Sequence, residues 1–91
     1  MHIEVIMRFI ISVFQSRNET LYFANMIRQR GVFSSIINTP KEAGQACGIS
    51  VKFDERNLAL AKNLLFSKPF KSFRGFYRIT NSEGRMIVEK L

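Results

Sequence analysis

The segment RFIISVFQSRNE, residues 8–19, decides the class of fold, because a strand pattern passes directly into a helix start within it. Residues 8–14 are β-branched, aromatic and almost continuously apolar, which is typical of a short strand buried on both faces. Ser16 and Glu19 then have the spacing of a capping box, in which each side chain satisfies a free backbone N–H of the other residue. We therefore predict a helix that starts after Ser16.

The predicted helix has one apolar face and a basic last turn, which suits the negative end of the helix dipole. Gly31 is expected to end it as a left-handed cap. The residues of the apolar face are Thr20, Phe23, Ala24 and Ile27, and those of the basic turn are Arg28 and Arg30.

The remaining segments predict four more strands and a second helix. Asp54 is expected to cap that helix and Pro69 to stop it, with Leu58, Ala61 and Leu65 on its inner face. The predicted strands are residues 32–38, 49–53, 72–80 and 85–91, with a connection over 39–48 and a turn over 81–84.

This order, β-α-β-β-α-β with an added strand, predicts an α+β fold of the ferredoxin-like class, with two helices on one face of an antiparallel sheet. Right-handed crossovers make the first two strands parallel, with the third between them. The fourth strand lies beyond the first, and the fifth extends that edge. We expect a single domain over residues 1–91, with 1–7 as a frayed N-terminus and 81–91 as a C-terminal hairpin extension.

Composition excludes several classes of site. The 91 residues include one cysteine and one histidine, His2, so a disulfide framework, a metal site and a His-based catalytic dyad are not expected. We predict no catalytic residue, no cofactor and no enzyme activity. The apolar N-terminal segment contains Glu4 and Arg8, is too short to span a bilayer and lacks the pattern of a secretion signal. A cytoplasmic protein without a membrane partner is therefore expected.

A net charge of +7 favours anionic partners. Residues 68–78 interleave cations with aromatic rings, a combination that binds single-stranded nucleic acid in other domains. The competing interpretation, which we favour, is that Phe73 or Phe76 packs in the core while the lysines are solvated. The candidate contacts for nucleic acid or another anion are Arg17, Lys68, Lys71, Arg74 and Arg78.

Cys47 lies between two glycines at the start of the strand over 49–53. The predicted topology brings its loop to the same end of the sheet as the start of the first helix and as residues 66–73. Arg17, Lys68 and Lys71 could therefore approach the thiol, and positive charge favours the reactive thiolate. The alternative is that Cys47 is a small buried hydrophobe, as free cysteines often are.

Four short motifs give the chain a resemblance to a known family. They are TPKE at 39–42, CGISVKF at 47–53, DERN at 54–57 and GFYRI at 75–79. Over residues 8–80 the chain resembles the small bacterial family named putative selenium/sulfur carrier protein-like. The resemblance implies that Cys47 carries sulfur or selenium as a persulfide-type adduct, without enzymatic activity, between donor and acceptor proteins. The loop residues that match the motifs are Thr39, Pro40, Lys41 and Gly48.

Two alternatives stay open beside the carrier role. The first is a basic binding module for single-stranded nucleic acid or an acidic partner protein. The second concerns assembly, since the fifth strand leaves a sheet edge through which two copies could pair as a homodimer.

Overall fold

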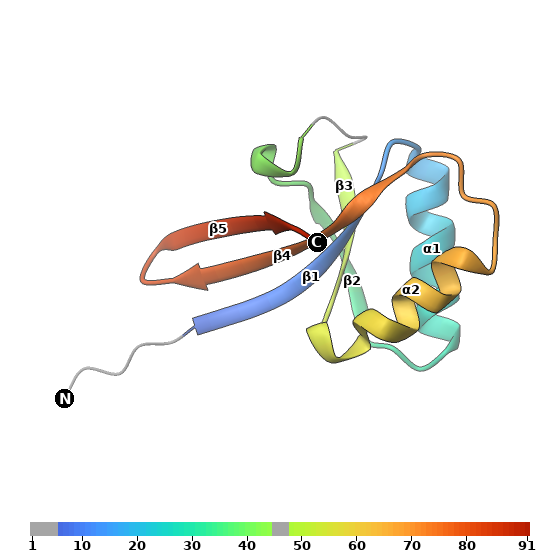
Figure 1. Cartoon of the computed structure of the whole chain (residues 1–91), viewed down its shortest axis with the longest axis horizontal. Helices are drawn as coiled ribbons and strands as arrows, with labels where there is room; N and C mark the ends of the chain where they lie inside the picture. The colour runs from blue at the N-terminus through green and yellow to red at the C-terminus, as the bar shows by residue number, and fades with distance from the viewer. Residues whose placement is uncertain (1–5, 45–47) are drawn as a thin grey trace.

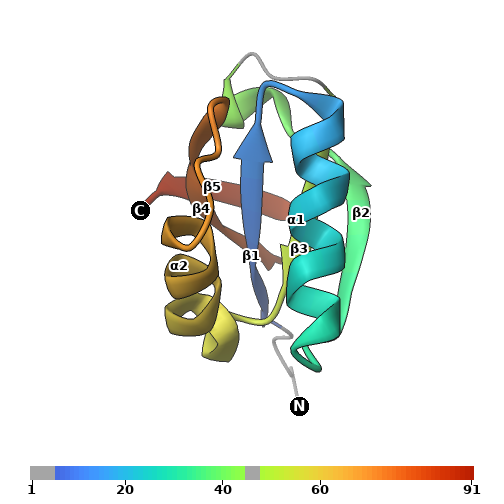
Figure 2. The ribbon, with the colours of Figure 1, turned by 90° about the vertical axis from the view of Figure 1, so that its right-hand side faces the viewer.

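Five antiparallel strands form one sheet in the order β2-β3-β1-β4-β5, and two helices cover one of its faces, as Figure 2 shows. The computed structural model describes residues 6–44 and 48–91. The strands are β1 (Ile6–Phe14), β2 (Ser34–Asn38), β3 (Ile49–Phe53), β4 (Phe73–Ser82) and β5 (Arg85–Lys90). The helices are α1 (Arg17–Gln29) and α2 (Leu58–Phe66), and two 3₁₀ turns are η1 (Lys41–Ala43) and η2 (Glu55–Asn57).

The α+β class and the predicted strand neighbours are confirmed. Strand β3 lies between β1 and β2, β4 lies on the far side of β1, and β5 is the outer strand beyond β4. Five strands in this order are not a simple ferredoxin fold, because β5 extends the sheet. The ferredoxin-like assignment of the whole chain therefore stays a prediction.

One end of the three-stranded ribbon formed by β1, β4 and β5 projects away from both helices (Figure 1). Ile6 and Met7 belong to β1 because they still pair with Ser82 and Asn81 of β4. The first strand therefore starts two residues earlier than the pattern predicted, within the segment that we expected to be frayed.

The turn between β4 and β5 is tighter than predicted. Ser82 pairs with Arg85, so only Glu83 and Gly84 connect the strands. Both have positive φ, 52° and 76°, as a two-residue type I′ turn requires. Asn81 and Ser82 consequently belong to the strand and not to the turn.

Helix α1 has the predicted N-cap but only half of the predicted capping box. The Ser16 hydroxyl accepts a hydrogen bond from the Glu19 backbone N–H at 3.2 Å. The Glu19 carboxylate does not return the contact, because it accepts from Lys71 and Ser72. The Ser16 backbone N–H donates to the Ser72 hydroxyl instead.

The other helix boundaries also move by a few residues. Asp54 caps η2, accepting from the Arg56 backbone N–H, and α2 proper starts after that turn. Helix α2 ends at Phe66, before Pro69, and the Ser67 hydroxyl donates to the Leu64 carbonyl at 2.7 Å. The helix therefore ends ahead of the proline, with the Ser67 hydroxyl satisfying one of its last carbonyls.

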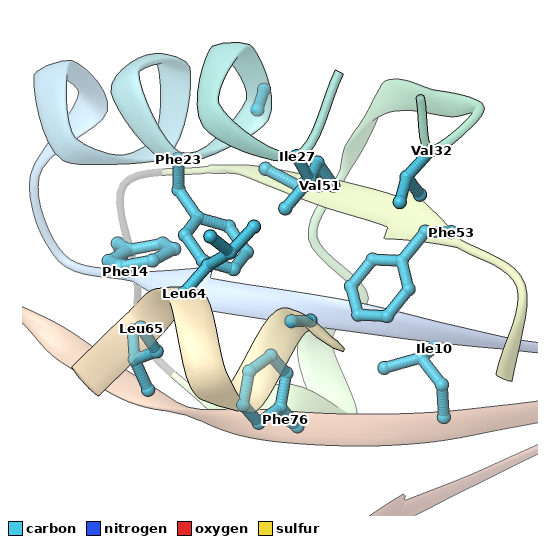
Figure 3. Packing of buried hydrophobic residues seen from close by; sticks show 12 residues of the cluster. Ile10, Phe14, Phe23, Ile27, Val32, Val51, Phe53, Leu64, Leu65 and Phe76 are labelled. Atoms are coloured by element: carbon cyan, nitrogen blue, oxygen red, sulfur yellow. The ribbon is translucent and has the colours of Figure 1, made fainter. Parts of the chain in front are cut away.

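The main core lies between the sheet and the helices, as Figure 3 shows. Ile10 and Phe14 of β1 are fully buried against the inner faces of α1 and α2. The helix residues in this core are Phe23, Ala24, Ile27, Ala61, Leu64 and Leu65. The predicted inner faces of both helices are confirmed, with Leu58 partly buried.

A second, smaller core lies on the opposite side of the sheet, which we call the helix-free face. Ile11 and Val13 of β1, together with Ile79 of β4, are fully buried there. Tyr77 and Ala43 complete the cluster. The first strand is thus buried on both faces from residue 10 to 14, as its continuous apolar run predicted.

Candidate functional site

The loop over residues 39–48 is closed at its base by two hydrogen bonds. The Thr39 backbone N–H donates to the Gly48 carbonyl at 2.9 Å. The hydroxyls of Thr39 and Ser50 share a hydrogen bond of 2.6 Å, and Ser50 is fully buried. Thr39 therefore fastens the two ends of the loop to each other and to β3.

The first half of this loop is folded onto the helix-free face. Pro40 leads into η1, whose turn is closed by the Ala43 backbone N–H donating to the Pro40 carbonyl at 3.0 Å. Ala43 is 4% exposed and packs in the second core. Lys41 stays exposed on the outside of the turn. Gly44 ends the turn with a φ of 85°, a conformation that favours glycine.

Cys47 lies outside the described residues, as do Gln45 and Ala46. Its role as a carrier thiol stays a prediction from the sequence. The described neighbours are Gly44 before it and Gly48 after it, and both have positive φ. The loop is thus anchored on each side of the three-residue segment that contains the thiol.

The segments predicted to meet at one end of the sheet do so. Figure 2 shows the start of α1, the η1 turn and the connection from α2 to β4 at the same end. Arg17 lies in the first turn of α1, and Lys68 and Lys71 lie in that connection; all three are exposed. Lys68 lines a groove beside Tyr22 and Phe70, on the helix layer.

Glu19 joins two of these segments. Its carboxylate accepts hydrogen bonds from the backbone N–H groups of Lys71 at 2.9 Å and Ser72 at 2.8 Å, and from the Ser72 hydroxyl. These hydrogen bonds lower the pKa of Glu19 below its ordinary value, and the bond from the Ser72 hydroxyl has the largest effect. Glu19 therefore holds residues 71–72 against the start of α1.

Arg78 is held by acidic neighbours. Its guanidinium donates to both oxygens of Glu55, at 3.0 and 2.6 Å, and lies 3.6 Å from Glu89. The hydrogen bonds with Arg78 lower the pKa of Glu55, and the same bonds raise the pKa of Arg78. A phosphate would have to compete with two carboxylates for this cation.

The aromatic residues of the basic stretch belong to the core. Phe76 is 5% exposed, and Phe73 and Phe70 pack beside it around Phe14. The interpretation favoured from the sequence, that Phe73 or Phe76 is a core residue, is therefore confirmed. Of the cations in this stretch, Lys68, Lys71 and Arg74 remain exposed.

The described part of the chain offers neither a metal-binding cluster nor a membrane-spanning helix. Residues 6–44 and 48–91 contain no group of three His, Cys, Asp or Glu side chains that could hold a metal ion. Neither described helix is long and apolar enough to cross a bilayer.

Comparison with known proteins gives one family. The model of the family described as "Putative Se/S carrier protein-like" matches residues 9–78, and the chain therefore belongs to that family. The match includes the whole loop over 39–48 and ends within β4. No curated protein and no solved structure matches the chain.

Proposed function

We propose that this member of the Se/S carrier-like family carries sulfur or selenium on the Cys47 thiol and delivers it to a partner protein. The observation that carries the proposal is the family match over residues 9–78, which includes the one cysteine of the chain. In this proposal the protein is a carrier and not an enzyme, because it is loaded by one protein and unloaded by another.

The chemistry of loading is a sulfur transfer between thiols. The Cys47 thiolate attacks the outer sulfur of a donor persulfide, the sulfur–sulfur bond of the donor breaks, and the donor thiolate leaves. One persulfide is consumed and one is formed, so no external oxidant is needed. Release repeats the same exchange with an acceptor thiolate, which must come from another protein because the chain has a single cysteine.

The architecture of the loop supports this proposal. A carrier thiol has to reach two different partners, and both reactions require access to its sulfur. Thr39 and Gly48 close the base of the loop, and Ala43 fastens its first half to the sheet. A loop held in this way on both sides leaves the packing of the core independent of the three residues between Gly44 and Gly48.

The test compares wild type with Cys47→Ser. A donor persulfide containing ³⁵S should label the wild-type protein, and the label should pass to an added acceptor thiol. Cys47→Ser should take no label, while its urea unfolding midpoint stays unchanged. Labelling of the serine variant, or wild type that takes no label, would exclude the proposal.

Iodoacetamide alkylation across pH gives a second test of the thiol. A carrier thiol should react near neutral pH, because the thiolate is the nucleophile. Alkylation that begins only above about pH 9 would show a thiol unsuited to this role.

The binding-module alternative has its own test. The aromatic residues of the basic stretch pack in or against the cores, and Arg78 is paired with Glu55. The remaining candidates are the exposed cations Arg17, Lys68, Lys71 and Arg74. A fluorescent single-stranded oligonucleotide would show salt-dependent binding at low ionic strength if these cations form such a surface. Binding that is equal in wild type and Cys47→Ser would favour this alternative, and its absence would end it.

The homodimer also stays a prediction. Strand β5 is an outer strand, so its free edge is available for pairing with a second copy. Its exposed charged residues, among them Arg85 and Lys90, are of the kind that oppose such pairing. Sedimentation equilibrium of the purified chain measures the mass of the assembly directly.

A further inference from the structure

A β-bulge directs one cation onto the helix-free face. Val13 pairs with Gly75 and Phe14 pairs with Phe73, so Arg74 is the extra residue of β4. Gly75 has a φ of 150°, which favours glycine at this position of the bulge. The Arg74 guanidinium donates a hydrogen bond to the Gln15 side-chain oxygen. Arg74 therefore lies beside the end of β1 and does not continue the alternation of the strand.

A second cation reaches the same place from β5. Lys90 is the cross-strand partner of Tyr77, on the helix-free face. A Cβ atom added to Gly75 would lie 3.0 Å from Cε of Lys90, so the lysine stem crosses the bare α-carbon of that glycine. The absence of a side chain at Gly75 thus lets Lys90 lie close to Arg74.

The two cations border a cavity of about 350 Å³. Its other borders are the buried ring of Tyr77, the Gln15 side chain and the η1 turn at Ala43 and Gly44. Because η1, β4, β5 and the residue that follows β1 each contribute to it, the pocket depends on how the fold brings these elements together.

The charges of this pocket are not neutralised within the described part of the chain. None of the described residues that line it is acidic. No described carboxylate forms an ion pair with Arg74 or Lys90. Glu89, which precedes Lys90, is directed toward Arg78 on the other face of the sheet. An anion entering this pocket would therefore meet two positive charges without displacing a carboxylate of the described residues.

We propose that this pocket binds a small tetrahedral oxyanion with two negative charges. The planar guanidinium of Arg74 can donate two parallel hydrogen bonds to such a group, and the Lys90 ammonium adds a compact charge. The Gln15 amide and the Tyr77 hydroxyl are neutral donors that can orient the remaining oxygens. The same chemistry is offered by a sulfur oxyanion such as thiosulfate and by a phosphate monoester.

The pocket is adjacent to the loop of the proposed carrier thiol, because Gly44 borders it. Naming a sulfur oxyanion as the physiological ligand rests on the proposed function, whereas the oxyanion site itself does not. The test is therefore made in the Cys47→Ser background, where sulfur transfer is absent and only binding is measured.

The experiment is a titration followed by amide chemical shifts in ¹⁵N-labelled protein. Sodium sulfate, thiosulfate and methyl phosphate are added separately, and sodium chloride keeps the ionic strength constant. The amides of Gln15, Gly44 and Gly75 should shift and saturate at millimolar ligand. In Arg74→Gln/Lys90→Gln the affinity should fall by about tenfold or more, since two charge-assisted contacts are lost.

The matched control removes two exposed cations from the helix layer, Arg28 and Lys62. Arg28→Gln/Lys62→Gln has the same net charge as the pocket variant and should bind as the parent does. Chemical-shift changes spread over the whole basic surface, or equal losses of affinity in the two double variants, would exclude a binding site at this pocket. Tighter binding of thiosulfate and sulfate than of methyl phosphate would assign it to sulfur oxyanions, and the reverse to phosphate monoesters. If persulfide labelling of Cys47 succeeds while this titration fails, only the pocket is excluded.

Discussion

Glu19→Gln tests how the start of α1 is joined to the connection before β4. The substitution keeps the size of the side chain and removes its charge. The carboxylate accepts two backbone N–H bonds and one hydroxyl bond from Lys71 and Ser72. The glutamine amide has one acceptor oxygen, and its NH₂ group would face donors. Hydrogen bonds to charged groups contribute about 1.5–3 kcal/mol when buried, and Glu19 is only partly buried.

We therefore expect Glu19→Gln to lower the free energy of unfolding by about 1–2 kcal/mol at pH 7. For a domain of this size that corresponds to a decrease in Tm of about 5–10 °C. Urea unfolding followed by circular dichroism measures the difference. The control is Glu42→Gln, which removes an exposed carboxylate from η1 and should change stability by less than about 0.5 kcal/mol.

The pH dependence of this difference has a definite sign. The pKa of Glu19 is lowered in the folded state, mainly by the Ser72 hydroxyl. Its stabilisation is therefore present above the ordinary glutamate pKa and is lost as the pH falls through the lower folded value. The difference in unfolding free energy between wild type and Glu19→Gln should narrow as the pH falls below the ordinary pKa of glutamate. A variant as stable as wild type at pH 7, or a gap that does not narrow in acid, would refute the reasoning.

Three other substitutions test separate parts of the fold by urea unfolding. Thr39→Val should lower the free energy of unfolding by about 1–2 kcal/mol, because it leaves the buried Ser50 hydroxyl without this hydrogen bond. An unchanged unfolding midpoint would show that this hydrogen bond does not hold the base of the loop. Ser12→Ala should stabilise by about 1 kcal/mol, since within the described structure this buried hydroxyl has no hydrogen-bond partner, and a loss of stability would reveal one. Gly84→Ala should lower the free energy of unfolding by about 1–2 kcal/mol, because the φ of 76° at this position is unfavourable for a residue with a Cβ. An unchanged free energy of unfolding would contradict the turn geometry.

The order of elements could be predicted from the sequence because local patterns and the main core agree. The apolar run of β1 and the helical spacing of Phe23 and Ile27 specify which faces are buried, and the structure buries them. The boundaries were less predictable where long-range contacts decide them. Ile6 is in β1 only because β4 extends far enough to pair with it, and no local signal contains that information.

The surroundings of the loop were harder to predict than the loop itself. The motif around Thr39 and Gly48 was visible in the sequence, and their hydrogen bond joins residues nine positions apart. Lys90 was missed because its place beside Arg74 depends on a bulge and on cross-strand register. The available signal was Gly75, a glycine inside a strand pattern, which often marks a bulge or the close approach of another chain segment.

Intact mass measurement of the protein after exposure to a persulfide donor tests the central claim most directly. Wild type should gain about 32 Da per transferred sulfur, the gain should disappear after treatment with a thiol reductant, and Cys47→Ser should gain nothing. A wild-type mass that stays unchanged, or an equal gain in Cys47→Ser, would contradict the assignment of Cys47 as the carrier of the cargo.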